Sequence, residues 1–156
     1  MSKRSIVYYL NLDCRSRAVH RILDTLTSPE IYHDLVELPK RNYPVPKEIR
    51  DSRNFFPWLK DCIGAIDGTH IPAHVPEGTR VAYRNRKGDI SQNVLAATTL
   101  DMMFVYVLPG WEGSATDSCI FDDAHANNFT IPAGRYYLAD AGYPNCDALL
   151  VPYRGM

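Results

Sequence analysis

Two aspartates, each preceded by a short apolar run and followed closely by glycine, are the residues of this 156-residue chain best suited to catalysis. Asp67 ends the apolar run Cys62–Ile66 and is followed at once by Gly68. Asp140 follows the run Tyr136–Ala139 in the segment G-R-Y-Y-L-A-D-A-G-Y-P. Short apolar runs of this kind are typical of buried strands. We therefore expect both carboxylates at strand tips, where a turn leaves them open to a substrate.

Carboxylates on neighbouring strand tips suit metal-dependent phosphoryl transfer. Mg²⁺ is a hard cation that prefers carboxylate oxygens, and Mn²⁺ accepts the same ligands. Two such ions, about 4 Å apart, activate a water molecule and stabilise the leaving oxygen when a phosphodiester is hydrolysed. The competing interpretation is that each aspartate only stabilises a turn, because Asp-Gly is a common turn pair. The repeated pattern favours the first interpretation and predicts Asp67 and Asp140 as catalytic, metal-binding residues.

A basic loop separates the first two predicted strands. It carries Arg84, Arg86 and Lys87, with Tyr83 beside them. The formal net charge of the chain is −1, so a surface for nucleic acid must be local rather than global. Cations with an interleaved aromatic ring suit a nucleic-acid backbone, and we predict that the three basic residues bind DNA. For each residue taken alone, a solvated hairpin tip is the better explanation of its presence.

Three further polar residues attract attention. His70 and His74 have the spacing of a helical zinc site, but Pro72 between them excludes a helix, so structural histidines are the favoured interpretation. Asp117, in G-S-A-T-D-S, could approach the metals. A capping role at a helix N-terminus is the interpretation that the local sequence favours.

The order of predicted elements indicates an α/β fold with a mixed sheet. Periodicity and turn residues predict strands over 62–71, 91–100, 103–108, 136–139 and 149–153, a helix over 114–127 and one helical turn over 145–148. Three antiparallel strands followed by strands after helical crossovers is the element order of the ribonuclease H-like fold. In that order the first and fourth strands are neighbours, which would set Asp67 beside Asp140.

The composition predicts a globular domain preceded by a short helical segment. Hydrophobic residues make up 46% of the chain and charged residues 22%. A helix is expected over 16–26 and a second, short one over 30–36, followed by an extended Pro-rich connector over 38–57. We place the domains at residues 1–54 and 55–156. The four cysteines fit no zinc signature, and no apolar run is long enough for a bilayer, so no membrane partner is predicted.

The motifs of residues 55–156 resemble, in order, those of the nuclease domain of PIF/Harbinger transposases and the cellular proteins derived from them. The matching segments are F-P-W-L-K-D-C-I-G-A-I-D-G-T-H-I-P-A, R-K-G-D-I-S-Q-N-V-L-A-A, V-L-P-G-W-E-G-S-A-T-D-S, Y-Y-L-A-D-A-G-Y-P and L-V-P-Y-R-G. The resemblance implies a ribonuclease H-like nuclease of the DDE type, which cuts DNA in the nucleus with Mg²⁺ or Mn²⁺. Asp67 matches the first acid of the triad and Asp140 the second.

The third acid of that family is a glutamate on a helix downstream of P-Y-R-G, and this sequence stops at Met156 without it. We therefore expect a C-terminally incomplete domain with weak or absent activity. One alternative is a non-catalytic, domesticated module that binds DNA or a protein, including a separate DNA-binding partner. Another is a phosphatase that uses the same aspartates on small substrates. An incompletely covered sheet also predicts a homo-oligomer, in the form of a dimer, or marginal solubility.

Overall fold

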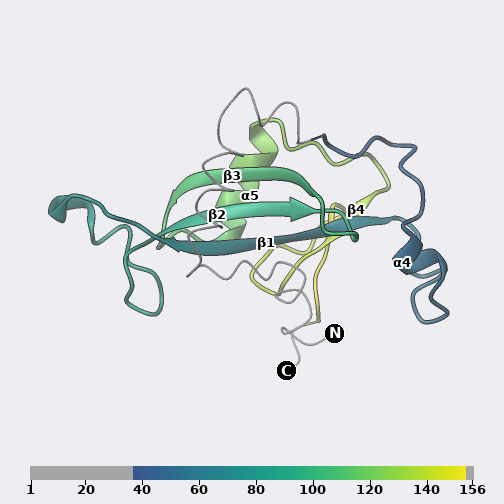
Figure 1. Ribbon diagram of the computed structural model, residues 1–156, viewed down its shortest axis with the longest axis horizontal. Coiled ribbons are helices and arrows are strands. Elements are labelled where there is room, and N and C mark those ends of the chain that lie inside the picture. Colours follow the sequence, from purple (N-terminus) through teal and green to yellow (C-terminus); the bar gives the residue numbers. More distant parts are fainter. Residues whose placement is uncertain (1–36, 154–156) are drawn as a thin grey trace.

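The computed structural model describes residues 37–153 and contains a five-stranded mixed sheet with one long helix against it (Figure 1). The strands are β1 (Cys62–Pro72), β2 (Ser91–Thr98), β3 (Phe104–Glu112), β4 (Tyr136–Leu138) and β5 (Leu149–Leu150). The helices are α4 (Lys47–Arg50) and α5 (Asp117–Ala126), with a 3₁₀ turn, η1, at Glu77–Thr79. The long connection from β1 to β2 extends from one end of the sheet, and α4 lies at the other end (Figure 1).

The strand order is β3-β2-β1-β4-β5. β1 pairs with β2, and β2 with β3, in antiparallel fashion. β4 lies parallel to β1 and to β5. The expected α/β class with a mixed, ribonuclease H-like sheet is therefore confirmed, as is the expectation that the first and fourth strands are neighbours.

β1 is the central strand, and its two halves have different surroundings. Its first half, Cys62–Ile66, is buried, and β4 pairs with it from Cys62 to Ala65. The pairing with β2 begins only at Ala65. From Asp67 to Pro72 the strand pairs with β2 alone among the described residues. Asp67 thus lies within β1, just past the point where β4 ends.

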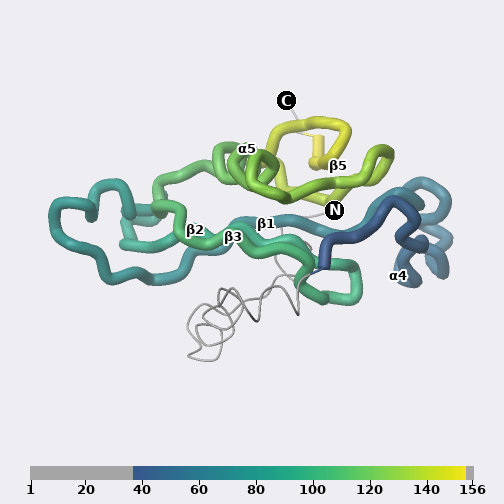
Figure 2. Tube along the Cα trace, turned by 90° about the horizontal axis from the view of Figure 1, so that it is seen from above, coloured from purple at the N-terminus to yellow at the C-terminus, as the bar shows by residue number. Residues whose placement is uncertain are grey.

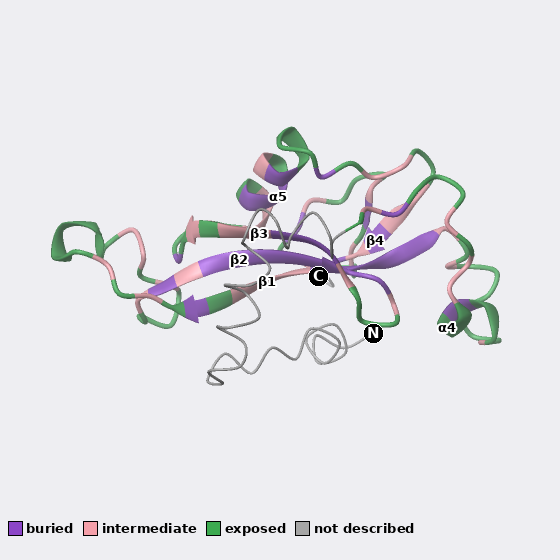
Figure 3. Cartoon of the chain, turned by 45° about the horizontal axis from the view of Figure 1, so that its top comes forward, coloured by how far each residue is buried: buried purple, intermediate pink, exposed green. Residues whose placement is uncertain are grey.

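The hydrophobic core lies between the sheet and α5. Figure 2 shows α5 in a second layer above β1, β2 and β3, and Figure 3 shows buried residues concentrated along the middle of these strands. The helix contributes Ile120, Phe121 and Ala124. The sheet and the loops contribute the remaining members, among them Ile63, Ile66, Leu95, Ala97, Val105, Phe129, Tyr137, Ala139 and Tyr143. This packing fixes the start of α5 above the middle of β1.

Several predicted boundaries were wrong. β3 continues to Glu112 rather than ending near residue 108, because the positive φ of Gly110 lets the chain keep pairing with β2. An edge strand also tolerates proline at position 109, where no partner strand needs an N–H. The turn expected to be helical at 145–148 instead forms an isolated bridge between Cys146 and Leu149. β5 stops at Leu150, short of the predicted 153.

The connector expected to be extended over 38–57 is not extended throughout. It contains α4, whose Ile49 is only 1% exposed and anchors the segment. The helices expected over 16–26 and 30–36 lie outside the described residues, and the boundary between residues 54 and 55 stays a prediction. In the described part of the chain, no helix has the length and apolar character to cross a membrane.

Candidate active site

Three aspartates from three parts of the fold influence one buried tyrosine. Tyr143 is 3% exposed, and its hydroxyl has no hydrogen-bond partner among residues 37–153. Burial raises the pKa of this phenol, and the negative charges of Asp117, Asp67 and Asp140 raise it further. The three carboxylates are therefore in the same region of the fold, and we call them the acid cluster.

Asp67 is the most strongly perturbed member of the cluster. Burial raises its pKa to about 7, the neighbouring Asp140 and Asp117 add to this, and the N–H of Gly68 partly offsets it. That N–H donates to Asp67 Oδ1 over 2.8 Å. An acid held this far above its ordinary pKa is one that a nearby cation would stabilise in its charged form.

The expectation that Gly68 turns the chain at a strand tip is wrong, because Gly68 lies inside β1. Because Gly68 has no side chain, side chains from other parts of the fold can approach β1 closely at this position. A Cβ at this position would lie 2.7 Å from Asp117 Oδ1 and 3.0 Å from Asn93 Oδ1. The glycine therefore leaves room for Asp117 to come down onto β1.

Asp140 lies two residues past the end of β4, after Ala139. The N–H of Gly142 donates to Asp140 Oδ1 over 2.6 Å, which holds the carboxylate above its own turn. A Cβ on Gly142 would lie 2.8 Å from Asp140 Oδ1 and 2.8 Å from Asp117 Oδ2. Asp140 Oδ1 and Asp117 Oδ2 are therefore separated by no more than twice 2.8 Å.

Asp117 is the member of the acid cluster for which the local sequence pattern favoured a different role, that of a helix cap. Thr116, not Asp117, caps α5, and its side chain accepts the N–H of Cys119. Asp117 is the first helical residue, where the helix dipole favours negative charge. Burial raises its pKa and so does Asp140, while Asn93, Arg86 and His70 lower it. The threonine before Asp117 was the signal in the sequence that could have indicated this, because a helix that Thr116 already caps does not need Asp117 as its cap.

The loop before α5 is pinned against β2, which sets the position of Asp117. A Cβ on Gly113 would lie 2.5 Å from the backbone oxygens of both Ser91 and Tyr83. On the other side of the helix start, the hydroxyl of Ser118 donates to the carbonyl of Gly142 over 3.1 Å. The helix start is therefore tied to β2 and to the turn that holds Asp140.

The acid cluster offers carboxylate oxygens to a divalent cation, whose remaining ligands would be water. As they stand, no three His, Cys, Asp or Glu side chains among residues 37–153 are close enough to hold one ion. Asp117 Oδ2 and Asp140 Oδ1 both approach the position that a Cβ of Gly142 would occupy, and both residues raise the pKa of Asp67. Mg²⁺ is commonly bound through one or two carboxylates and keeps several waters. Within the described residues, none of the three aspartates forms a salt bridge that would neutralise it.

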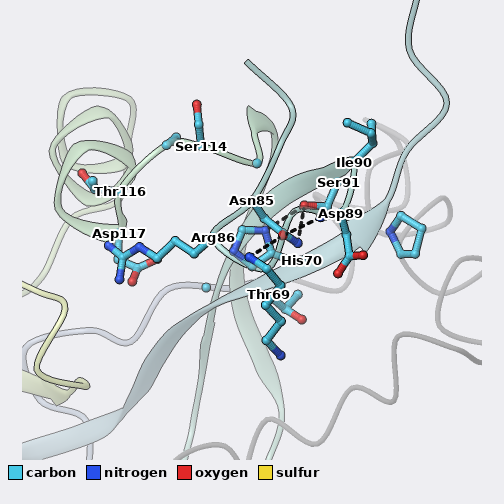
Figure 4. A pocket seen from close by; sticks show the side chains of 15 residues that line it. Thr69, His70, Asn85, Arg86, Asp89, Ile90, Ser91, Ser114, Thr116 and Asp117 are labelled. Atoms are coloured by element: carbon cyan, nitrogen blue, oxygen red, sulfur yellow. Dashed lines mark hydrogen bonds between the residues drawn. The ribbon is translucent and has the colours of Figure 1, made fainter. Parts of the chain in front are cut away.

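A cleft of about 780 Å³ opens beside the acid cluster (Figure 4). Its walls are the second half of β1, the loop before β2 and the loop before α5, and both Gly68 and Asp117 line it. His70 projects into it with Nδ1 3.0 Å from the hydroxyl oxygen of Ser91, which also accepts Nδ2 of Asn85 over 3.2 Å. Burial lowers the pKa of His70, and Lys87 and Arg86 lower it further, against the raising effect of Asp117. Burial thus favours the neutral form of the imidazole.

The three predicted DNA-binding residues differ in position. Arg86 and Lys87 line the cleft, and the guanidinium of Arg86 lies beside Asp117 (Figure 4). Arg84 is not among the lining residues, and its guanidinium donates to the carbonyl of Gly88 over 3.0 Å. Two of the three cations therefore face the region of the carboxylates, and the third stabilises the loop that carries them.

Comparisons with known proteins identify the family of this chain. The family model of the DDE superfamily endonucleases matches residues 66–156, which include the whole acid cluster. The protein ALP1-like of Arabidopsis thaliana is 25% identical over 164 residues, covering 94% of this chain but 39% of its own length. No solved structure matches significantly. Endonucleases of this superfamily generally use divalent metals. The match to more than half of the chain, together with the sheet that carries Asp67 and Asp140, confirms the resemblance seen in the motifs: the chain belongs to the DDE superfamily endonucleases.

Proposed function

We propose that this domain hydrolyses phosphodiester bonds in DNA with divalent metal bound at the acid cluster. The observation that carries the proposal is the approach of the Asp117 and Asp140 carboxylates at Gly142, with Asp67 of β1 near enough for both to raise its pKa. Family membership supports the reaction class. The expected downstream glutamate is not needed for a three-acid cluster, because Asp117 contributes the third carboxylate.

Each residue has a separate role in this proposal. Asp117 and Asp140 would supply carboxylate ligands to the cation, and Asp67, on β1, would add a third negative charge near it. A bound Mg²⁺ or Mn²⁺ would act as a Lewis acid that activates water and stabilises the leaving oxygen. The buried wall formed by Tyr143 limits the water around the carboxylates, which strengthens their attraction for a cation.

The cleft would hold the DNA strand beside the carboxylates. Arg86 and Lys87 supply positive charge for its phosphates, and the neutral His70 supplies a ring N–H. When Nδ1 of His70 accepts the Ser91 hydroxyl, Nε2 carries the proton and can donate to a phosphate oxygen. The cluster and the cleft share Gly68 and Asp117, so a phosphate bound here is next to the carboxylates.

The test is cleavage of duplex DNA in Mg²⁺ or Mn²⁺ by the wild-type domain and by Asp67→Ala, Asp117→Ala and Asp140→Ala. Each substitution should reduce the rate by at least about a hundredfold, because the carboxylates act as a unit. Asp122→Ala is the matched control, since Asp122 is an exposed aspartate on the same helix. Cleavage that survives all three substitutions would overturn the assignment of the site.

A second candidate is a module that binds DNA without cutting it. It is favoured by the spacing of the carboxylates, of which no three are close enough to hold one ion as they stand in residues 37–153. The chain also spans 39% of the length of the curated relative it matches. Salt-sensitive DNA binding with no cleavage at any metal concentration would support this candidate. Hydrolysis of small phosphate esters without DNA binding would instead indicate a phosphatase.

The same proposal includes the setting in which the domain works. A DNA substrate implies a nuclear location, and the resemblance to transposase-derived proteins implies a separate DNA-binding partner. We also propose that the isolated domain self-associates. Trp58 is 80% exposed and Tyr153 is 87% exposed, and large exposed side chains of this kind favour association. Sedimentation velocity over a concentration series would reveal a dimer, and a monomer at all concentrations would contradict it.

A further inference from the structure

One asparagine connects the loop before β2 to the histidine of the cleft. Figure 4 shows Asn85, Ser91 and His70 close together, and hydrogen bonds join Asn85 to Ser91 and Ser91 to His70. Asn85 belongs to the loop, Ser91 begins β2, and His70 lies in the second half of β1. The three side chains therefore form a hydrogen-bonded series in which the chemistry of each group restricts the next.

The orientation of the Asn85 amide is set by the backbone of its own loop. Oδ1 accepts the N–H of Lys87 over 2.9 Å and the N–H of Asp89 over 3.0 Å. The reverse orientation would place the NH₂ group against these two donors and is excluded. The same contacts hold the turn that carries Arg86 and Lys87 along the cleft. Nδ2 is therefore the atom of the amide that faces Ser91.

The hydroxyl of Ser91 has a single hydrogen, and its surroundings decide where that hydrogen lies. Ser91 is 2% exposed, and its oxygen accepts Nδ2 of Asn85 over 3.2 Å. The same oxygen lies 3.0 Å from Nδ1 of His70. If Nδ1 carried the proton, the oxygen would accept twice, and its own hydrogen would have no acceptor within residues 37–153. A buried donor without a partner costs free energy, so the hydroxyl donates to Nδ1 instead.

This arrangement leaves the proton of His70 on Nε2. The histidine is exposed and lines the cleft, so its Nε2–H is open to a ligand there. Arg86 and Lys87 line the same cleft. A ring N–H beside two cations suits a phosphate oxygen, which accepts hydrogen bonds and carries negative charge. An unprotonated Nε2 is itself an acceptor and would not bind that oxygen.

We infer that Asn85 is a positioning residue of the cleft, which acts through Ser91 to keep the Nε2–H of His70 available to a phosphate oxygen of DNA. The inference rests on the proposed function, because it presupposes that the cleft binds DNA. It goes beyond that function by deciding the tautomer of His70 and by assigning its control to a residue outside the acid cluster. No metal ion takes part in it.

The first test is nitrogen-15 NMR of the 156-residue chain labelled at histidine, because ring nitrogens with and without a proton resonate at well separated frequencies. His70→Phe identifies the His70 signals among the five histidines. The spectra are recorded at pH 8 in EDTA, where the imidazole is neutral, since burial lowers its pKa from 6.5. His70 of the wild type should carry its proton on Nε2. A proton on Nδ1 would overturn the inference, and this measurement needs no variant of Asn85.

Asn85→Asp should move the proton of His70 to Nδ1. The carboxylate keeps an oxygen for the two N–H groups of the loop, but it replaces the donor that faces Ser91 with an acceptor. The Ser91 hydroxyl then donates to the carboxylate and accepts from Nδ1. Proton positions that stay unchanged in this variant would overturn the role of Asn85.

Gln92→Glu is the matched control for the added charge. Gln92 follows Ser91 in β2, so its side chain lies on the opposite face of the sheet. This variant makes the same change from amide to carboxylate and should leave the His70 signals as they are in the wild type. A proton that moves equally in both variants would mean that charge alone, and not the hydrogen-bonded series, sets the tautomer.

Binding of duplex DNA in EDTA tests the contact with phosphate. In a double-mutant cycle, Asn85→Asp is introduced into the wild type and into His70→Phe, so that the repulsion from the added charge cancels. Asn85→Asp should weaken binding about tenfold more in the wild type, because only there is a hydrogen bond to a charged oxygen lost. Equal losses in the two backgrounds would show that Asn85 acts on the loop alone and would overturn the inference.

The inference and the proposed function fail in different ways. If the chain binds and cuts DNA but His70 carries its proton on Nδ1, the inference is wrong and the proposed function stands. If the proton moves in Asn85→Asp as expected but the chain does not bind duplex DNA, the contact with phosphate and the proposed function are both wrong.

Discussion

The carboxylates of Asp117 and Asp140 approach Gly142 from two directions, and each brings an oxygen to 2.8 Å from the point that a Cβ there would occupy. One aspartate begins α5 and the other follows β4, so their meeting depends on the packing of the helix against the sheet. Asp67 adds a third carboxylate from β1. The site is therefore a property of the assembled core rather than of any one segment.

Replacing Asp117 should remove metal binding without unfolding the domain. Asp117→Asn keeps the shape of the side chain but removes the charge that faces Asp140, and the loss of a carboxylate ligand should weaken Mn²⁺ binding at least about tenfold. The metal-free melting temperature should rise, because mutual repulsion among the acids is relieved. Calorimetric titration and melting curves measure the two effects. Asp122→Asn is the control, and an equal change in both variants would contradict the role of Asp117.

The stability of the metal-free domain should fall as the pH rises from about 4 to about 7. The folded protein keeps the proton of Asp67 until its pKa of about 7, whereas the unfolded chain loses it near 3.8. Between these values the folded state binds more protons, so the free energy of unfolding decreases with pH, by on the order of 3 kcal/mol. Urea denaturation at a series of pH values in EDTA measures this decrease.

Asp67→Asn provides the control for that pH dependence. Its free energy of unfolding should lack most of the decrease and should exceed that of the wild type above pH 7. Saturating Mg²⁺ should raise the stability of the wild type most at high pH, where Asp67 is charged. Parallel pH profiles for wild type and variant would show that Asp67 does not titrate as described.

Gly142→Ala should separate the facing carboxylates. The added Cβ would contact Asp117 Oδ2 and Asp140 Oδ1 at 2.8 Å, so at least one carboxylate must move. We expect Mn²⁺ affinity to fall about tenfold and the domain to be destabilised by about 1–3 kcal/mol. Gly78→Ala is the control, because a Cβ on Gly78 meets nothing within 4 Å. Unchanged metal affinity in Gly142→Ala would mean that the pair does not hold the ion.

The salt dependence of DNA binding should identify which cations contact phosphate. Arg86→Gln and Lys87→Gln should each reduce the slope of log K against log salt by about 1, measured with duplex DNA in EDTA. Arg84→Gln should change the slope less, because this guanidinium is bound to Gly88 O in its own loop. Lys60→Gln, outside the cleft residues, is the control. Equal slopes for all four variants would exclude the cleft as the DNA-binding surface.

The strands next to Asp67 and Asp140 could be predicted from the sequence, because an apolar run with an acid at its end is a local feature. Gly68 was misinterpreted because a glycine serves both turns and close contacts, and the group it accommodates, Asp117, lies far along the chain. Asp117 itself was judged by its neighbours, which suggest a cap, whereas its position is set by the packing of α5. The extension of β3 through Gly110 likewise depends on pairing with β2, which no local pattern reveals.

The uneven pairing of β1 has a mechanical consequence. β4 pairs with β1 from Cys62 to Ala65, and β2 pairs with it from Ala65 to Pro72, so the two ladders overlap at Ala65. Asp67 lies two residues past this overlap, where β2 alone flanks β1 among the described residues. Because β1 exchanges one partner strand for the other beside the acid cluster, a small bend at this point would change the position of Asp67 relative to Asp140, which comes after β4.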